Sequence, residues 1–306
     1  MDQLRKYENV ITVHRFSKFL NPILLRFRFL SLVSPKRIWE TNLQSATRLG
    51  LVKPIFILSF DCDTDLDISV VESVHSKLLS VGIRPIYAVP GELLILGSEV
   101  YKRIRESGAE FINHGYKSHS EVSLPDRKYR GTFFYEKSVE SEILEDIVLG
   151  HQTIRRVLGL EATVFRTPHF GGFSKTSHLR LLWETLANLN YQISSSTTPF
   201  FGYVNGPFSI HNGISELPVS GDPRKPHQIL DSWSYTFSGN ISLTRVDFIN
   251  ALEEFAIAMR LGKKVFLNIY ADPSQVYDWP EFFEAVAKLS TYNVGSFLTA
   301  RSTFSG

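Results

Sequence analysis

Two aspartates lie two residues apart directly after an apolar run, and this spacing suits a reactive site. The run at residues 54–58 predicts a buried strand, and Asp61 and Asp63 follow it. Residues two apart on an extended chain share one face. The carboxyl ends of parallel strands open into the crevice where α/β proteins bind their ligands. Two carboxylates there can divide the work between holding a metal ion and accepting a proton.

A pair of histidines follows a later predicted strand at residues 110–112. His114 and His119 come directly after it. A first-row divalent metal in a hydrolase commonly takes three protein ligands and keeps one position for water. Asp63, His114 and His119 would supply such a set. We therefore expect one divalent ion, with Zn²⁺ as the first choice and Co²⁺ or Ni²⁺ as alternatives, because metal availability decides among them.

Residues 165–170 form a third group at a strand end. Arg166 could hold Asp61 in a bidentate pair that lowers the pKa of this carboxyl, or it could form a purely structural ion pair. Pro168 would stiffen the loop, and Phe170 would form an aromatic wall of the substrate site. These residues predict a positioned base beside a binding surface.

A fourth group, Asp231 and Trp233, lies in a region rich in Gly, Pro, Ser and Asn at residues 196–239. An indole beside a carboxylate is typical of sugar-binding grooves, although a tryptophan in the core is as common. We assign both residues to substrate binding.

Strands and helices alternate along most of the chain. We expect strands at residues 54–58, 85–89, 110–113, 163–165, 192–195 and 264–270, and helices at residues 70–81, 100–105 and 139–157 and between Thr244 and Gly262. Ser138 is the expected N-cap of the third helix. This pattern favours an α/β fold with a distorted (β/α) barrel at residues 53–306, preceded by a partly helical N-terminal extension at residues 1–52.

Composition limits the classes of protein. The 306 residues are 43% hydrophobic and 21% charged, which suits one large core. Lys and Arg total 33 against 31 acids, so the chain lacks the basic footprint of nucleic-acid-binding proteins. Cys62 is the only cysteine, which excludes an internal disulfide and favours a reducing, cytoplasmic location.

The N-terminal segment is apolar but interrupted. Residues 16–33 contain Lys18, Arg26 and Arg28 and are broken by Pro22, so they cannot span a bilayer cheaply, and no secretory signal is visible. Two interpretations stay open for residues 15–37. They form either a helix packed on the catalytic domain, which is favoured, or a basic amphipathic segment in peripheral contact with the inner membrane face.

The order of these motifs resembles that of the polysaccharide deacetylases, the NodB-homology group of carbohydrate esterase family four, over residues 55–298. The resemblance implies a distorted (β/α) barrel that removes acetyl groups from N-acetylated sugars with a divalent metal. It implies that Asp61 is the general base, Arg166 its partner and Trp233 a pocket residue. It also implies that Asp63, His114 and His119 are the metal ligands.

Two positions depart from the family pattern. The histidines are usually four residues apart, whereas here they are five apart. The family carries a histidine before a proline as general acid, and this chain has Asp272 before Pro273. An aspartate can donate a proton near neutral pH only if desolvation or a nearby anion raises its pKa. His169 is the alternative acid, because it titrates near neutral pH.

The predicted activity is that of a metal-dependent carbohydrate N-deacetylase, a hydrolase of linear amide C–N bonds. The substrate would be an N-acetylated sugar of a surface polysaccharide or its precursor, including a glycolipid. Two alternatives stay open: a catalytically impaired sugar-binding or scaffold relative, and a glycosyltransferase that uses the D-x-D motif. A phosphotransferase of the haloacid-dehalogenase group needs a glycine where Thr64 stands.

Overall fold

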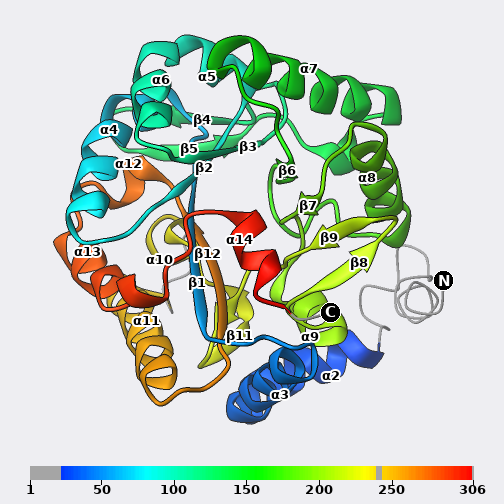
Figure 1. Cartoon of the computed structure of the whole chain (residues 1–306), viewed down its shortest axis with the longest axis vertical. Helices are drawn as coiled ribbons and strands as arrows, with labels where there is room; N and C mark the ends of the chain where they lie inside the picture. Colours follow the sequence, from blue (N-terminus) through cyan, green and yellow to red (C-terminus); the bar gives the residue numbers. More distant parts are fainter. Residues whose placement is uncertain (1–21, 239–242, 305–306) are drawn as a thin grey trace.

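The computed structural model describes residues 22–238 and 243–304. Its main sheet has eight strands in the order β12-β1-β2-β3-β6-β7-β9-β8. The strands are β1 (Ile55–Asp61), β2 (Ile86–Val89), β3 (Glu110–Asn113), β6 (Val164–Phe165), β7 (Ile193–Ser194), β8 (Ser209–His211), β9 (Ile214–Glu216) and β12 (Phe266–Ala271). All neighbours pair in parallel except β8 and β9. The sheet curls into a distorted barrel with helices outside it, as the sequence predicted (Figure 1).

The central strand β1 explains why the diacid motif lies inside the molecule. All seven of its residues are buried, and it pairs with β12 on one side and β2 on the other. A parallel strand covered on both faces requires a continuous apolar run, which residues 55–58 supply. The carboxyl ends of β1, β2 and β12 therefore lie together at one end of the barrel.

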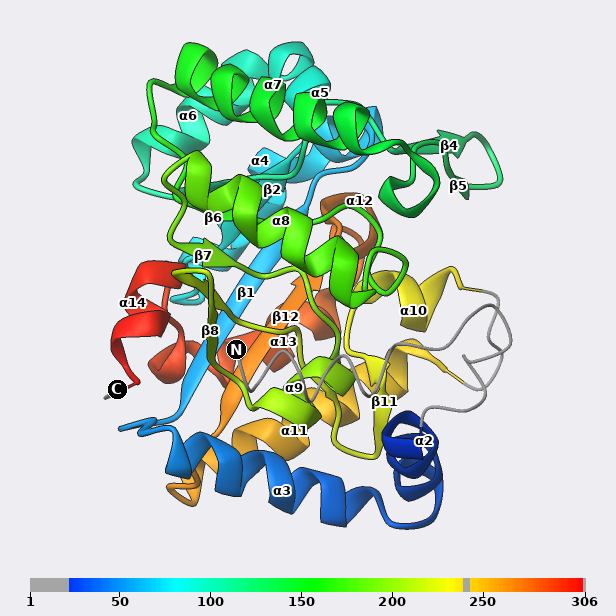
Figure 2. The same ribbon diagram turned by 90° about the vertical axis from the view of Figure 1, so that its right-hand side faces the viewer.

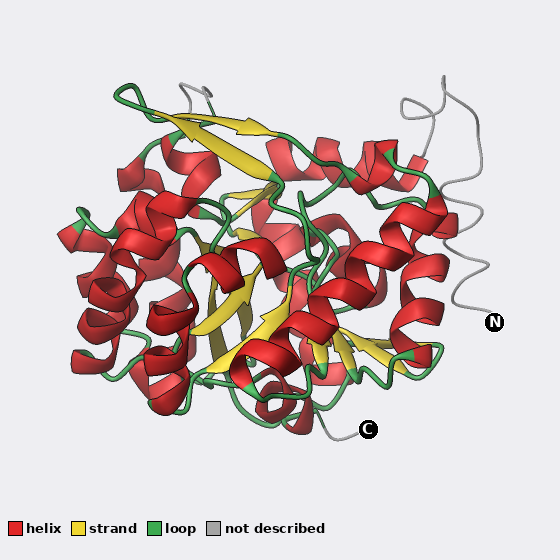
Figure 3. Cartoon of the chain, turned by 90° about the horizontal axis from the view of Figure 1, so that it is seen from above, coloured by secondary structure: helices red, strands yellow, loops and turns green. Residues whose placement is uncertain are grey.

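Helices surround the sheet (Figure 3). The longer ones are α4 (Asp65–Ser80), α6 (Ser98–Glu106), α7 (Glu140–Leu158), α8 (Thr176–Asn188), α11 (Arg245–Arg260) and α13 (Pro280–Ala287). Shorter helices are α5 (Gly91–Leu96), α9 (Pro199–Asn205), α10 (Ser232–Thr236), α12 (Pro273–Val276) and α14 (Phe297–Ser302). The helix predicted to begin at Thr244 is confirmed as α11, which starts with a capping box of Thr244 and Asp247. The prediction of Ser138 as the N-cap of α7 is wrong, because Val139 holds that position and Glu142 bonds to its N–H.

The region predicted to be irregular contains regular elements. It forms α9, the β8–β9 hairpin, a second hairpin of β10 (Gly221–Asp222) and β11 (Lys225–Ile229), and α10. Strands of two to five residues are too short to show a periodic pattern. One signal was available, because Asn212 and Gly213 both adopt positive φ, which is the turn geometry that Asn-Gly favours in a tight hairpin.

The barrel wall closes through an irregular segment on the free side of β12. The Asn268 side chain donates to the carbonyl oxygens of Leu217 (3.1 Å) and Pro218 (3.2 Å). The Ser220 N–H donates to the Asn268 carbonyl oxygen (2.7 Å), and the Asn268 N–H donates to the Ser220 hydroxyl (3.0 Å). A few hydrogen bonds between β12 and residues 217–220 thus take the place of the regular hydrogen bonding between paired strands.

The N-terminal extension contains α2 (Pro22–Val33) and α3 (Pro35–Arg48), which pack against the barrel. Phe27 of α2 contacts the rings of Phe200 (5.4 Å) and Tyr203 (5.0 Å). This packing agrees with the favoured interpretation of the segment, of which residues 15–21 lie outside the described part. Among the described helices none is both long and apolar enough to cross a membrane.

Candidate metal centre and active site

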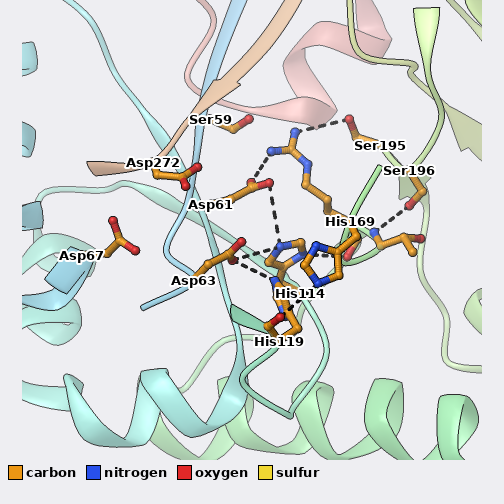
Figure 4. A network of polar contacts seen from close by, with 12 residues as sticks. Ser59, Asp61, Asp63, Asp67, His114, His119, His169, Ser195, Ser196 and Asp272 are labelled. Carbon is orange, nitrogen blue, oxygen red and sulfur yellow. Dashed lines mark hydrogen bonds and ion pairs between the residues drawn. The ribbon is translucent and has the colours of Figure 1, made fainter. Parts of the chain in front are cut away.

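Asp63, His114 and His119 converge beyond the ends of β1 and β3 (Figure 4). One ligand atom from each lies within 4.8 Å of the others. The Asp63 Oδ1 atom is 2.9 Å from His119 Nε2 and 3.4 Å from His114 Nε2. Neither Asp63 Oδ1 nor His119 Nε2 makes a well-aligned hydrogen bond, although the two atoms lie close together. One carboxylate and two imidazoles that converge in this way are a donor set that fits a divalent ion.

The first histidine is oriented by the backbone. The His114 Nδ1 lies 2.9 Å from the carbonyl oxygen of Arg166 and donates to it, which points Nε2 toward Asp63. Burial raises the pKa of Asp63, but the neighbouring His119 and His114 side chains outweigh it and hold this pKa well below its usual range. The Asp63 carboxylate is therefore ionised, as a metal ligand must be.

A glycine loop brings the second histidine back to the first. Gly115 has a φ of +81°, and a Cβ there would overlap the Oδ2 atom of Asp146. The same carboxylate accepts from the Lys117 N–H (2.8 Å) and from the Tyr135 hydroxyl (2.7 Å). The chain between the histidines thus forms a loop held by Asp146, and not a helical turn. This loop brings His119 next to His114 although the two are five residues apart.

Asp61 is held beside the metal ligands by a buried arginine. The Arg166 Nη1 donates to Asp61 Oδ1 at 2.6 Å, and its Nη2 contacts the Ser195 hydroxyl at 3.4 Å. The predicted bidentate pair is therefore wrong, because one terminal nitrogen is used by Ser195. The other carboxylate oxygen, Asp61 Oδ2, lies 3.8 Å from His114 Nε2 and faces the metal site.

Asp272 follows β12 and faces the same volume as the diacid (Figure 4). It is 7% exposed. Burial raises its pKa well above the usual value, and the charges of Asp63, Asp67 and Asp61 add to this effect. Gln275 donates to its Oδ2, and the Ser232 hydroxyl donates to the Gln275 carbonyl oxygen at 2.7 Å. The structure therefore supplies the desolvation and anions that an acidic role requires.

His169, the other candidate acid, contacts the backbone of the candidate ligand His119. Its Nε2 donates to the His119 carbonyl oxygen (3.0 Å), and its ring stacks on Phe134 at 4.6 Å. Burial and the charge of His119 lower its pKa. The Nε2 proton of His169 is thus held in a hydrogen bond to a backbone carbonyl oxygen.

The candidate binding residues differ in exposure. Pro168 is buried, whereas the half-buried Phe170 packs on Tyr270 with ring centroids 4.9 Å apart. Asp231 caps α10 and is buried, and burial raises its pKa to about 6. Trp233 is 42% exposed, so it is not a core tryptophan.

Sequence reasoning missed several residues around the diacid. Asp67 accepts from the Thr64 and Ser274 N–H groups, and Ser195 also accepts from the Asn268 side chain at 3.0 Å. Asn268 lies on β12 and Ser195 comes directly after β7, and the Ser195 hydroxyl contacts both Asn268 and Arg166. Strand-end position could have identified Ser195, which follows β7.

The sequence matches no family model and no curated protein. Solved structures do match. A protein from Mycobacterium smegmatis assigned as a polysaccharide deacetylase is 16% identical, with a TM-score of 0.59 over 83% of this chain and 90% of its own. A family 4 carbohydrate esterase from Streptomyces lividans in complex with acetate is 14% identical, with a TM-score of 0.45 over 78% of this chain and 87% of its own. A family 4 pseudoenzyme from Bacillus anthracis is 10% identical, with a TM-score of 0.46 over 80% and 65%.

The match to the mycobacterial protein defines the class of fold. The likeness to the mycobacterial protein extends over most of both chains, so this chain has the polysaccharide deacetylase fold. The structure adds a site of one carboxylate and two imidazoles at the mouth of the barrel.

Proposed function

We propose that this protein is a metal-dependent hydrolase that removes an acetyl group from an N-acetylated sugar. One observation carries the proposal: the ligand atoms of Asp63, His114 and His119 converge within 4.8 Å of one another beside Asp61, which Arg166 holds in place. A cation held by these three residues would lie next to a carboxylate positioned to accept a proton from water.

Asp63, His114 and His119 would hold the ion. A divalent ion there supplies a Lewis acid that polarises the acetyl carbonyl and lowers the pKa of water. Asp61 takes the proton from the attacking water, because its Oδ2 faces the site while its Oδ1 is bound by Arg166. Loss of this base would cost about a hundredfold to ten-thousandfold in rate.

Asp272 donates the proton to the leaving amine nitrogen. Its buried position keeps the carboxyl protonated at higher pH than an exposed aspartate, and Gln275 fixes one of its oxygens. His169 is less suited, because its Nε2 proton is bound to a carbonyl oxygen. Phe170 and the exposed Trp233 would contact the sugar ring, and Asp231 would belong to the same binding site.

The proposed substrate is an N-acetylated sugar of a surface polysaccharide or its lipid-linked precursor, met in the cytoplasm. Zn²⁺ is the proposed ion, because two imidazoles and one carboxylate suit it.

Three variants test the assignment. Asp61→Asn should retain the metal, measured by elemental analysis, and lose acetate release from N-acetylglucosamine oligosaccharides. Asp63→Asn should lose both. Asp65→Asn is the matched control, because Asp65 is an exposed carboxylate two residues further on.

Two outcomes contradict the proposal. Unchanged acetate release by Asp61→Asn would show that Asp61 is not the general base. A wild-type protein that binds the metal but releases no acetate would favour the sugar-binding or scaffold alternative.

A further inference from the structure

Helix α2 is apolar on two opposite faces. Its inner face packs Phe27 against the barrel. Its outer face exposes Leu25, Phe29, Leu32 and Val33, with exposed fractions of 63% for Phe29 and 74% for Leu32. A contiguous exposed apolar patch rimmed by polar residues marks a site of contact with a protein or a membrane. The outer face of α2 therefore requires a partner.

The outer residues form a continuous stripe. At 3.6 residues per turn, positions 25, 29, 32 and 33 fall within about 100° of the helix circumference. Arg26 and Arg28, both exposed, lie on its two sides. This arrangement is typical of helices that lie in the plane of a bilayer, with apolar side chains among the acyl chains and basic ones at the headgroups.

Charge distinguishes a lipid surface from a second copy of the chain. The sequence from Pro22 to Trp39 contains four basic residues, all exposed, and no acid: Arg26, Arg28, Lys36 and Arg37. A symmetric dimer through this face would bring like charges together, which is unfavourable. A bilayer that contains anionic lipids attracts the same charges.

Helix α2 lies on the same side of the molecule as the barrel mouth (Figure 2). Helix α2 contacts β11, and β11 leads directly to Asp231. Figure 2 shows α2, α10 and the hairpin of β4 (Ser120–Ser123) and β5 (Lys128–Gly131) on one side of the molecule. Leu124, next to β4, is 69% exposed on this hairpin. A surface that meets α2 would therefore also meet the entrance to the site.

We infer that the outer face of α2 docks this protein on a bilayer that carries anionic lipids and turns the mouth of the barrel toward it. The inference goes beyond the proposed hydrolysis and does not depend on it, because binding is measured without any acetylated sugar.

The experiment is co-sedimentation of the full chain with two kinds of vesicle, phosphatidylcholine alone and phosphatidylcholine mixed with phosphatidylglycerol. The protein should bind the mixed vesicles more tightly, and added NaCl should weaken this binding. Phe29→Ser with Leu32→Ser should lower the partition coefficient about tenfold or more. Arg26→Gln with Arg28→Gln should remove most of the preference for the anionic vesicles.

The matched control is Ile257→Ser with Leu261→Ser, which removes two apolar side chains of similar exposure, 48% and 72%, at the end of α11. It should bind as the wild type does. Thermal unfolding checks that all variants are folded. The inference is overturned if the wild type does not bind the mixed vesicles, or if Phe29→Ser with Leu32→Ser binds as tightly as the wild type. It is also overturned if sedimentation equilibrium shows a dimer that these two substitutions dissociate.

Discussion

At the scale of single residues, the candidate site has the candidate metal ligands on one side and an unusual candidate acid, Asp272, on the other. Asp63 is ionised because two imidazoles outweigh its burial, and Asp61 is fixed by Arg166. On the far side, Asp272 stands where the family that the sequence resembles has a histidine. Its carboxyl is surrounded by other carboxylates, which disfavours its charged form.

The first prediction concerns Asp272. Because its pKa is raised, its proton is present at low pH and is lost as the pH rises through that pKa. We expect kcat to fall on the alkaline side in the wild type. Asp272→Asn should lower kcat about a hundredfold to ten-thousandfold and lack this fall, measured by acetate release across pH.

Asp272→His is the companion variant, because an imidazole can also donate the proton. It should retain much more activity than Asp272→Asn. Equal activity of wild type and Asp272→Asn at every pH would assign the acid to another residue.

At the scale of elements, the loop between β3 and β4 decides whether the second histidine reaches the metal site. The sequence indicated both histidines, but their separation of five residues departs from the four that are usual in the family it resembles. The observed loop depends on Gly115 and on the Asp146 carboxylate, which comes from α7. No local pattern relates α7 to this loop, because that contact forms only after the barrel is assembled.

The second prediction tests this loop. Gly115→Ala places a Cβ against Asp146 Oδ2 at a positive φ, so the loop must move. We expect the metal affinity to fall and the free energy of unfolding to drop by about 1–3 kcal/mol from the overlap, measured by metal titration and by denaturant unfolding.

Gly108→Ala is the control. Gly108 also has a positive φ, of +85°, but a Cβ there meets no atom within 4 Å. Gly108→Ala should introduce the same kind of backbone strain as Gly115→Ala but leave the metal affinity unchanged. Equal loss of affinity in both variants would show that strain, and not the contact with Asp146, explains the effect.

The sequence predicted the strands that carry the site better than the elements around them. Apolar runs identified β1, β3 and β12, because strands covered on both faces must be continuously apolar. The same reasoning found Asp61, Asp63 and His114 at strand ends. Applied to β7, it could also have indicated Ser195, whereas Gln275 does not differ locally from an ordinary polar residue. The contacts of Ser195 with Arg166 and of Gln275 with Ser232 join segments that are distant in the sequence.

At the scale of the whole molecule, the metal site connects β1 to the loop after β3. An ion that binds only the folded chain stabilises it, by about 2.7 kcal/mol at a concentration one hundred times the dissociation constant. Its removal should therefore destabilise the entire barrel.

The third prediction follows. A chelator should lower the Tm of the metal-loaded wild type, and restoring the metal should raise it again, both measured by calorimetry. Asp63→Asn should unfold at the same temperature with and without chelator. A wild-type Tm that does not respond to metal would contradict the proposed centre.

The seam between β12 and residues 217–220 has a consequence for how the molecule opens. Asn268 spans this seam and also donates to Ser195, which contacts Arg166. Regions held by few hydrogen bonds exchange their amide protons before the core does. We expect the amides of Ser220 and Asn268 to exchange with deuterium earlier than those of β1. Each such opening would also break the contact of Ser195 with Arg166, which holds Asp61. The lifetime of the closed seam would therefore set how long Asp61, the proposed base, stays aligned.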